Sequence, residues 1–225
     1  MRRSLLSLIE SIDYPTELTV VDNGQDQVDS EFLLNLAHAG KINTYIRNAN
    51  NMHFGWSRNQ GIQIANGDYF CIVDNDLVYE KGWLSKCVAI LDENPDKKIY
   101  STPVGYPTSG FKRYKMGFIK FEGVDCELNM RAGSNCFVVR REDMKKIGRF
   151  YAHKIAGTKW TDRAVKAGYL AVIIPGKVLD VGLRTGYNFN DKLPIKLNLI
   201  SGPSIFFNQD NGLPEGELNY EQRVF

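Results

Sequence analysis

The stretch Gly67-Asp68-Tyr69-Phe70-Cys71-Ile72-Val73-Asp74-Asn75-Asp76 joins a short apolar run to a pair of acids. The apolar run follows an Asn66-Gly67 turn and predicts a buried β-strand. Two carboxylates two residues apart, directly after such a strand, can share one divalent cation, because carboxylate oxygens are the ligands that Mg²⁺ and Mn²⁺ prefer. Ligands of α/β proteins bind at the carboxyl ends of strands. The stretch therefore predicts a Mn²⁺ or Mg²⁺ site in a crevice, where a phosphate-bearing substrate shares the metal.

The composition is that of a single enzyme-sized domain. The chain has 225 residues, of which 43% are hydrophobic and 24% charged, so it can bury a large core. The formal net charge is only +2, which argues against a nucleic-acid binder driven by bulk charge.

The four cysteines have no C-x-x-C spacing, which argues against a structural zinc site and favours reduced thiols in an intracellular compartment. The basic start at Arg2-Arg3 is followed by an apolar stretch that ends at Glu10, too short for a signal peptide. No run approaches the roughly 18 apolar residues that a transmembrane helix needs. We therefore expect a cytoplasmic protein with no transmembrane segment.

Hydrophobic periodicity alternates between strands and helices along the first half of the chain. This alternation predicts an α/β fold with one doubly wound, mainly parallel sheet flanked by helices. Residues 103–125 read as a hairpin or as a loop that shapes a site. Helices are expected over 2–12, 31–38, 55–65, 81–93, 141–147 and from Thr161 or Asp162 to Ala167, and strands over 18–21, 42–46, 68–73, 99–102, 135–140 and 169–174.

The C-terminal tail has a pattern of its own. Lys196 to Ile200 reads as a strand, and a loop that contains Gly202 follows it. We place the main domain at residues 1–192. Residues 193–225 are either a C-terminal extension or the start of a following domain.

Three blocks of sequence carry a resemblance to a known family. They are Val20-Val21-Asp22-Asn23-Gly24, then Asn50-Asn51-Met52-His53-Phe54-Gly55-Trp56-Ser57-Arg58-Asn59-Gln60-Gly61, then Gly67-Asp68-Tyr69 leading to Asp74-Asn75-Asp76. Their order and spacing, over roughly residues 2–182, resemble glycosyltransferase family 2. The resemblance implies a GT-A fold and inverting transfer of a sugar from a nucleotide-sugar, usually a UDP-sugar, to a glycan or sugar acceptor. The tail pattern is also similar to multidomain glycosyltransferases of algal viruses, for which the compartment is the host cytoplasm.

The resemblance implies a role for each of these polar residues. Asp22 binds the nucleotide base, unless it only forms a turn, and Arg58 lies near the donor, unless it is a solvated helix residue. In the D-x-D motif, Asp76 ligates the metal, and Asp74 reaches it directly or through water, or binds the ribose; Asn75 lies between them at the donor. Asp180 stands where many relatives place a metal-binding or diphosphate-binding histidine, and His153 is an alternative.

At the catalytic base the sequence departs from the family pattern, because Thr161-Asp162 replaces the acidic pair. Asp162 is the candidate, in Lys159-Trp160-Thr161-Asp162-Arg163, because the family places an acidic pair before a helix that ends like Lys166-Ala167-Gly168-Tyr169. If Arg163 is instead aligned with the family arginine, the acidic positions fall on Ala156 and Gly157, which cannot act as bases. Asp162 could also be a helix N-cap. Glu122, Asp125 and Asp143 are fallback acids, Trp160 is a candidate for stacking on an acceptor ring, and Gly133-Ser134-Asn135 resembles the acceptor-side segment.

Relatives begin with a strand that precedes the 2–12 helix, whereas this sequence begins at the helix. Either that strand is absent or another segment, such as 196–200, fills its place. Without it we expect a gap in the central sheet, with a cost in buried backbone hydrogen bonds. Two rival functions remain. A sugar nucleotidyltransferase would need a Gly-rich basic phosphate loop near the start, which the sequence lacks, and the other rival is an inactive or binding-only domain.

Overall fold

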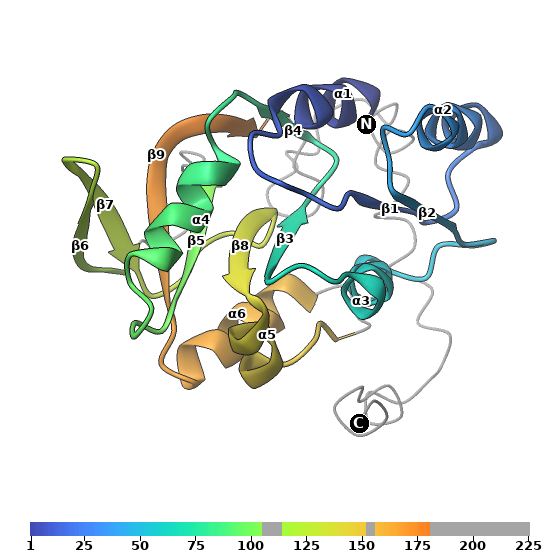
Figure 1. The fold of residues 1–225 in the computed structure, drawn as a ribbon. Coiled ribbons are helices and arrows are strands. Elements are labelled where there is room, and N and C mark those ends of the chain that lie inside the picture. The colour runs from blue at the N-terminus through green and yellow to red at the C-terminus, as the bar shows by residue number, and fades with distance from the viewer. Residues whose placement is uncertain (105–113, 152–155, 181–225) are drawn as a thin grey trace, which may run out of the picture.

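The computed structural model describes residues 1–104, 114–151 and 156–180. Helices and strands alternate through most of this part of the chain (Figure 1). The helices are α1 (Arg2–Ser11), α2 (Gln27–His38), α3 (Phe54–Ile64), α4 (Leu84–Asp92), α5 (Arg141–Ile147) and α6 (Ala156–Lys166). The strands are β1 (Thr19–Asp22), β2 (Thr44–Arg47), β3 (Tyr69–Val73), β4 (Leu77–Tyr79), β5 (Ile99–Val104), β6 (Lys115–Phe121), β7 (Val124–Asn129), β8 (Cys136–Arg140) and β9 (Leu170–Asp180).

The sheet has an apolar layer on each face. Successive side chains of β8 point to opposite faces, so Cys136 and Val138 pack in one core cluster and Phe137 and Val139 in the other. The first cluster includes side chains of α1, α2 and α4, and the second includes side chains of α3, α5 and α6. Figure 1 shows α1 and α2 of the first group above the central strands, and α5 and α6 of the second group below them. A strand that is buried on both faces explains the continuous apolar run of β8.

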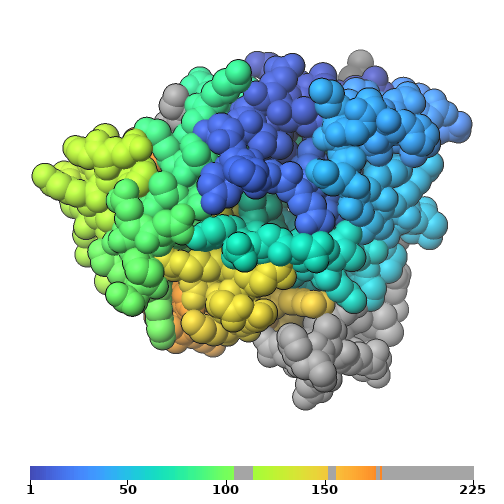
Figure 2. All heavy atoms as spheres, in the orientation of Figure 1, coloured from blue at the N-terminus to red at the C-terminus, as the bar shows by residue number. Residues whose placement is uncertain are grey.

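The larger sheet runs in the order β3-β8-β5-β9-β7-β6, and β4 pairs with β9. The pairs β1–β2 and β5–β9 are parallel and the other described pairs are antiparallel, so the strand directions are mixed. The predicted α/β class is confirmed. Of the hairpin or loop expected over 103–125, a hairpin is present, but it lies later in the chain, as β6 and β7 over residues 115–129. It projects at the left edge in Figure 2, opposite the α2–β2 region. Residues 105–113 lie outside the described residues.

A break separates β1 from the larger sheet. Within the described residues, β1 pairs only with β2, and β3 pairs only with β8. The described strands therefore show the gap in the central sheet that the sequence predicts, and it lies between β1 and β3. The segment 196–200, named as a possible occupant, lies outside the described residues.

Most helix boundaries match the sequence. The predicted helix over 141–147 is α5, and Gly148 ends it with a positive φ of 89°, as expected of a C-terminal glycine. Three starts were wrong: α2 begins at Gln27 and not at Glu31, α4 at Leu84 and not at Lys81, and α6 at Ala156 and not at Thr161 or Asp162. Asp162 is consequently inside the helix and does not cap it. The strand β4, which the sequence reading did not anticipate, follows the D-x-D motif directly.

All four cysteines are free thiols, as the sequence predicts. No helix in the described part of the chain combines the length and hydropathy that crossing a membrane requires.

Candidate active site

Asp22 lies at the end of β1 with its carboxylate buried. It accepts hydrogen bonds from Ser30 Oγ at 2.5 Å, from Tyr45 Oη at 2.8 Å and from the Gln25 backbone N–H at 2.9 Å. Arg47 Nε lies 3.8 Å away. Burial by itself would raise the pKa of Asp22, but the hydrogen bonds and the arginine charge outweigh it, so the pKa is lowered and the carboxylate stays ionised. The Gln25 contact shows the turn-forming role directly, whereas contact with a nucleotide base stays a prediction.

A chain of carboxamides holds the loop between β2 and α3 against the end of β1. Asn23 donates to Asn51 Oδ1 at 3.0 Å, and Asn48 donates to Asn23 Oδ1 at 3.1 Å. Asn48 and Gln60 exchange two further hydrogen bonds, at 2.9 and 3.0 Å. Sequence reasoning missed this network. The only signal for it was the concentration of asparagines between positions 48 and 51.

Gly24 brings this loop close to β1. Its φ is +82°, and a Cβ at this position would lie 2.9 Å from the backbone of Asn50 and Asn51. A glycine is therefore required for both the conformation and the approach.

Arg58 joins α3 to the D-x-D motif. Its Nη2 donates to Asp74 Oδ1, and its guanidinium carbon lies 4.9 Å from the Phe54 ring centroid and 5.0 Å from that of Phe150. The Arg58 side chain is 10% exposed and the Asp74 side chain 38% exposed. The sequence alternative of a solvated helix residue is therefore wrong for Arg58, because the aromatic rings and the carboxylate enclose it.

The D-x-D motif forms the connection between β3 and β4. The Asp74 backbone N–H donates to Asn135 O at 2.7 Å, which attaches the predicted acceptor-side segment to the motif. Asn75 and Asp76 are exposed. Asp180 pairs with Leu77, the residue directly after Asp76, so the β9 backbone brings this predicted ligand next to the motif.

The described residues include no group of three or more His, Cys, Asp or Glu that could hold a metal ion. Two hard-oxygen donors on one exposed connection nevertheless fit a Mg²⁺ or Mn²⁺ ion that takes its other ligands from water and a substrate diphosphate. Asp74 and Asp76 would hold such an ion. The structure describes only the backbone of Asp180, so its part as a ligand stays a prediction.

The helix α6 places Asp162 beside Arg131, with 2.7 Å between Asp162 Oδ1 and Arg131 Nη2. Asp162 is five residues beyond Gly157, or about 7.5 Å along the helix axis. Gly157 itself lies against Ser134 and Arg58, because a Cβ there would overlap Ser134 Oγ and lie 3.8 Å from Arg58 Nη1. The start of α6 thus lies nearer to the Arg58–Asp74 pair along the helix than Asp162 does.

Several other candidates lie elsewhere. Trp160 is fully buried against Phe137 and Phe150, and its indole N–H donates to Gly148 O at 3.0 Å, so the idea that it stacks on an acceptor was wrong. Asp143 follows β8 at the end where Arg140 pairs with Tyr69, the end of β3 opposite to Asp74. Glu122 and Asp125 belong to the β6–β7 hairpin, at the far edge of the sheet. His153 lies outside the described residues.

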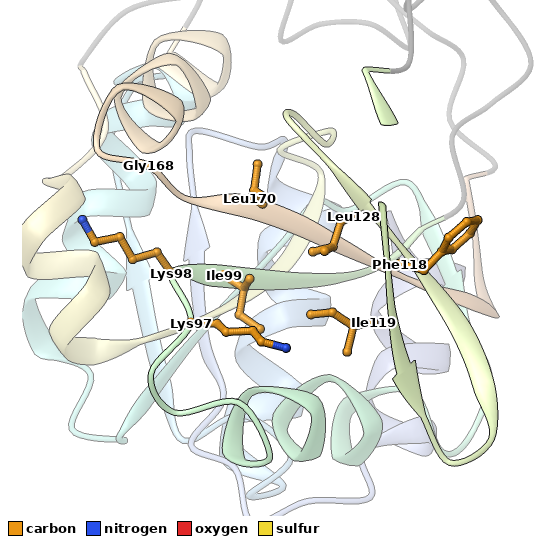
Figure 3. A pocket seen from close by; sticks show the side chains of 8 residues that line it. All are labelled: Lys97, Lys98, Ile99, Phe118, Ile119, Leu128, Gly168 and Leu170. Carbon is orange, nitrogen blue, oxygen red and sulfur yellow. The ribbon is translucent and has the colours of Figure 1, made fainter. Parts of the chain in front are cut away.

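An apolar pocket of about 280 Å³ lies away from these residues (Figure 3). Ile99, Ile119, Leu128 and Leu170 form its walls, and no predicted site residue lines it. Lys98 also borders it, but its ammonium donates to Ala167 O at 3.0 Å and points away from the cavity. The pocket is therefore separate from the D-x-D site.

A comparison of the sequence with models of protein families identifies the family of this chain. The family model described as Glycosyl transferase family 2 matches residues 1–154. The chain belongs to glycosyl transferase family 2. The matched range contains the three blocks that carry the resemblance in the sequence. Within the curated proteins, no match was found.

Similar solved structures support the GT-A fold of this family member. A crystal structure of GalNAc-T7 with UDP, GalNAc and Mn²⁺ has a TM-score of 0.59 at 14% identity, over 77% of this chain and 40% of that one. The structure of S. aureus TarS has a TM-score of 0.56 at 18% identity, over 78% of this chain and 33% of that one. Residues 1–349 of TarS, in complex with UDP-GlcNAc, match at a TM-score of 0.56 and 17% identity, over 95% of this chain and 64% of that one. The family and fold that the sequence predicts are confirmed, and the chain spans less than two thirds of each of these proteins.

Proposed function

We propose that this glycosyl transferase family 2 member moves a sugar from a nucleotide-sugar, with UDP as the nucleotide, to a hydroxyl group of a glycan acceptor. The observation that carries the proposal is the Arg58–Asp74 ion pair, which ties the second sequence block to the D-x-D motif at the carboxyl end of β3. The complexes of GalNAc-T7 with UDP and of TarS with UDP-GlcNAc support the choice of donor.

The donor diphosphate is assigned to the exposed connection after β3. Asp74 and Asp76 would hold a Mn²⁺ or Mg²⁺ ion there, with Asn75 beside the donor and Asp180 as a further ligand. When bound, the ion acts as a Lewis acid for the negative charge that grows on the leaving diphosphate. Asp22, at the end of β1, orients the uracil base of the nucleotide. Its ionised carboxylate is already fixed by hydrogen bonds from Ser30 and Tyr45.

Transfer also needs a group that takes the proton of the acceptor hydroxyl as it attacks. Asp162 is our candidate for this base, in a single in-line displacement that inverts the anomeric carbon. Its contact with Arg131 keeps the carboxylate in one place on α6. The acceptor would then approach along the segment 133–135, which is bonded to Asp74 through Asn135 O.

A second function is favoured by one specific observation. The first turn of α6, nearest to Arg58, contains no acidic residue, and Asp162 is paired with an arginine. A domain that binds nucleotide-sugars but does not transfer the sugar would have these features.

Calorimetry separates these functions when UDP, UDP-glucose and UDP-GlcNAc are titrated with Mn²⁺ and with EDTA, alongside an assay of donor hydrolysis. The transferase proposal expects Mn²⁺-dependent binding of UDP and slow release of free sugar from one donor. Binding without any turnover, either hydrolysis or transfer to a panel of glycan acceptors, would support the binding-only function. Absence of UDP binding with Mn²⁺ would contradict both.

A further inference from the structure

The two ends of the Arg58 guanidinium have different surroundings. Nη2 bonds to Asp74, whereas Nη1 is buried and has no hydrogen-bond partner among the described residues. The Arg58 side chain is only 10% exposed and lies over the rings of Phe54 and Phe150, so its position is fixed. A buried guanidinium N–H without a partner is costly, and a bound ligand that supplies the acceptor would remove this cost.

Nη1 is directed to the first turn of α6. A Cβ on Gly157 would lie 3.8 Å from Nη1 and would overlap Ser134 Oγ, so the Ser134 hydroxyl occupies the space that a side chain at position 157 would need. The first N–H groups of a helix have no partners within the helix and carry partial positive charge. No acidic residue is present in this turn to balance them.

Three kinds of donor therefore meet beside Asp74: the free guanidinium N–H of Arg58, the Ser134 hydroxyl and the amides that open α6. We propose that they form a subsite for an anionic group, a carboxylate or a phosphate, carried by the sugar substrate. The proposed function assigns the diphosphate to the Asp74 side of the guanidinium, so we assign Nη1 to a second anion. This inference rests on the proposed function, since it specifies the class of sugar that the same site accepts.

The anionic group belongs either to the transferred sugar or to the acceptor, and paired ligands distinguish the two sources. The donor pair is UDP-glucuronate and UDP-glucose, which differ in charge at C6. The acceptor pair is glucuronate and glucose, each titrated with Mn²⁺ and saturating UDP. Calorimetry should show that the charged member of one pair binds about tenfold more tightly than its neutral partner, as a charge-assisted hydrogen bond implies.

Matched variants test whether the named residues cause this preference. Ser134→Gly makes room at position 157, and Gly157→Asp in that background puts a carboxylate next to Nη1. The isosteric control is Gly157→Asn in the same background. The reference is Ser134→Gly alone, whose preference for the charged ligand should be weaker than that of the unaltered protein because one donor is lost. The remaining preference should be lost in the aspartate variant and kept in the asparagine variant. Arg58→Lys, which keeps a cation for Asp74 but has no Nη1, should also lose it and serves if the double variants do not fold.

Equal binding of charged and neutral ligands in both pairs would overturn the subsite. So would a preference that persists in both the aspartate variant and Arg58→Lys. These outcomes leave Mn²⁺-dependent UDP binding of the unaltered protein as a separate readout of the proposed function. If UDP does not bind, glucuronate and inorganic phosphate titrated alone still decide whether the subsite takes anions.

Discussion

Arg58 donates to Asp74 from one end of its guanidinium, so the helix that follows the asparagine loop fixes the first acid of the D-x-D motif. The arginine is buried and the carboxylate is 38% exposed, which gives the ion pair an enclosed side and an open side. The aromatic rings that flank Arg58 come from Phe54 in α3 and Phe150 after α5. Segments nearly a hundred residues apart in sequence therefore control the position of Asp74.

Asp74→Asn removes the charge of this acid with little change in shape. We expect the affinity for UDP in Mn²⁺ to fall at least tenfold, because a carboxamide is a weaker ligand for a hard cation. The free energy of unfolding should fall by about 1–3 kcal/mol, because Arg58 loses its charged acceptor. Calorimetry and urea unfolding measure the two effects. Asp96→Asn, in the exposed turn after α4, is the control, and unchanged UDP affinity in Asp74→Asn would remove this acid from the metal site.

The buried carboxylate of Asp22 should make the stability of the folded protein depend on pH. Its pKa is lowered in the folded protein by Ser30, the Gln25 N–H, Tyr45 and Arg47, which outweigh burial. Its ionisation therefore stabilises the fold at pH values above the unfolded pKa of about 4, and this contribution is lost as the pH falls through the folded pKa. Asp22→Asn should be less stable than the unaltered protein at pH 7, and the difference should narrow below about pH 4.

Denaturant unfolding from pH 7 to pH 3 measures this difference. Asp125→Asn, at an exposed position of β7, serves as a control that should track the unaltered protein throughout. A stability difference for Asp22→Asn that stayed constant across the range would show that the charge of Asp22 does not cause it.

Two glycines of α3 offer a matched pair. A Cβ on Gly55 would overlap the Tyr151 carbonyl oxygen and lie 2.7 Å from Ala156 Cβ. Gly55→Ala should cost about 1–3 kcal/mol of stability, because backbone atoms must move. A Cβ on Gly61 lies 3.8 Å from Thr19 Cγ2, an ordinary contact. Gly61→Ala should stabilise the protein by about 0.5–1 kcal/mol through helix propensity, and equal effects of the two substitutions in urea unfolding would disprove the close packing of α3 on α6.

The sequence predicts those features that local patterns determine. The run before Asp74 is a strand because it is short and apolar, and α5 has the predicted limits because Gly148 can take the positive φ that ends it. The break between β1 and β3 agrees with the gap that the sequence predicts in the central sheet. Each of these depends on residues adjacent in the chain or on the order of elements.

The start of α6 could not be read locally. Thr161-Asp162 has the composition of a helix N-cap, whereas the turn from Ala156 to Lys159 contains a glycine and no acid. Trp160 packs against Phe137 and Phe150, and this packing stabilises the helical conformation of the turn that precedes it. Because these rings come from other parts of the chain, the local sequence does not reveal the contact. The pairing of Asp162 with Arg131, and the place of Ser134 next to Gly157, depend on the same packing.

Variants of Asp162 and of its partner Arg131 show whether Asp162 has a catalytic or only a structural role. If Asp162 is the base, Asp162→Asn should lower kcat for transfer by about 10²-fold or more and leave the KM for the donor unchanged. Arg131→Gln should keep kcat within about tenfold, because the carboxylate that accepts the proton remains. If the pair only joins α6 to the segment before β8, both variants should lose the same small stability, at most about 1 kcal/mol for an exposed pair, with equal and minor effects on kcat. Steady-state kinetics with the donor that shows turnover, together with urea unfolding of both variants, distinguishes these results. Equal kcat values in the two variants would exclude Asp162 as the base.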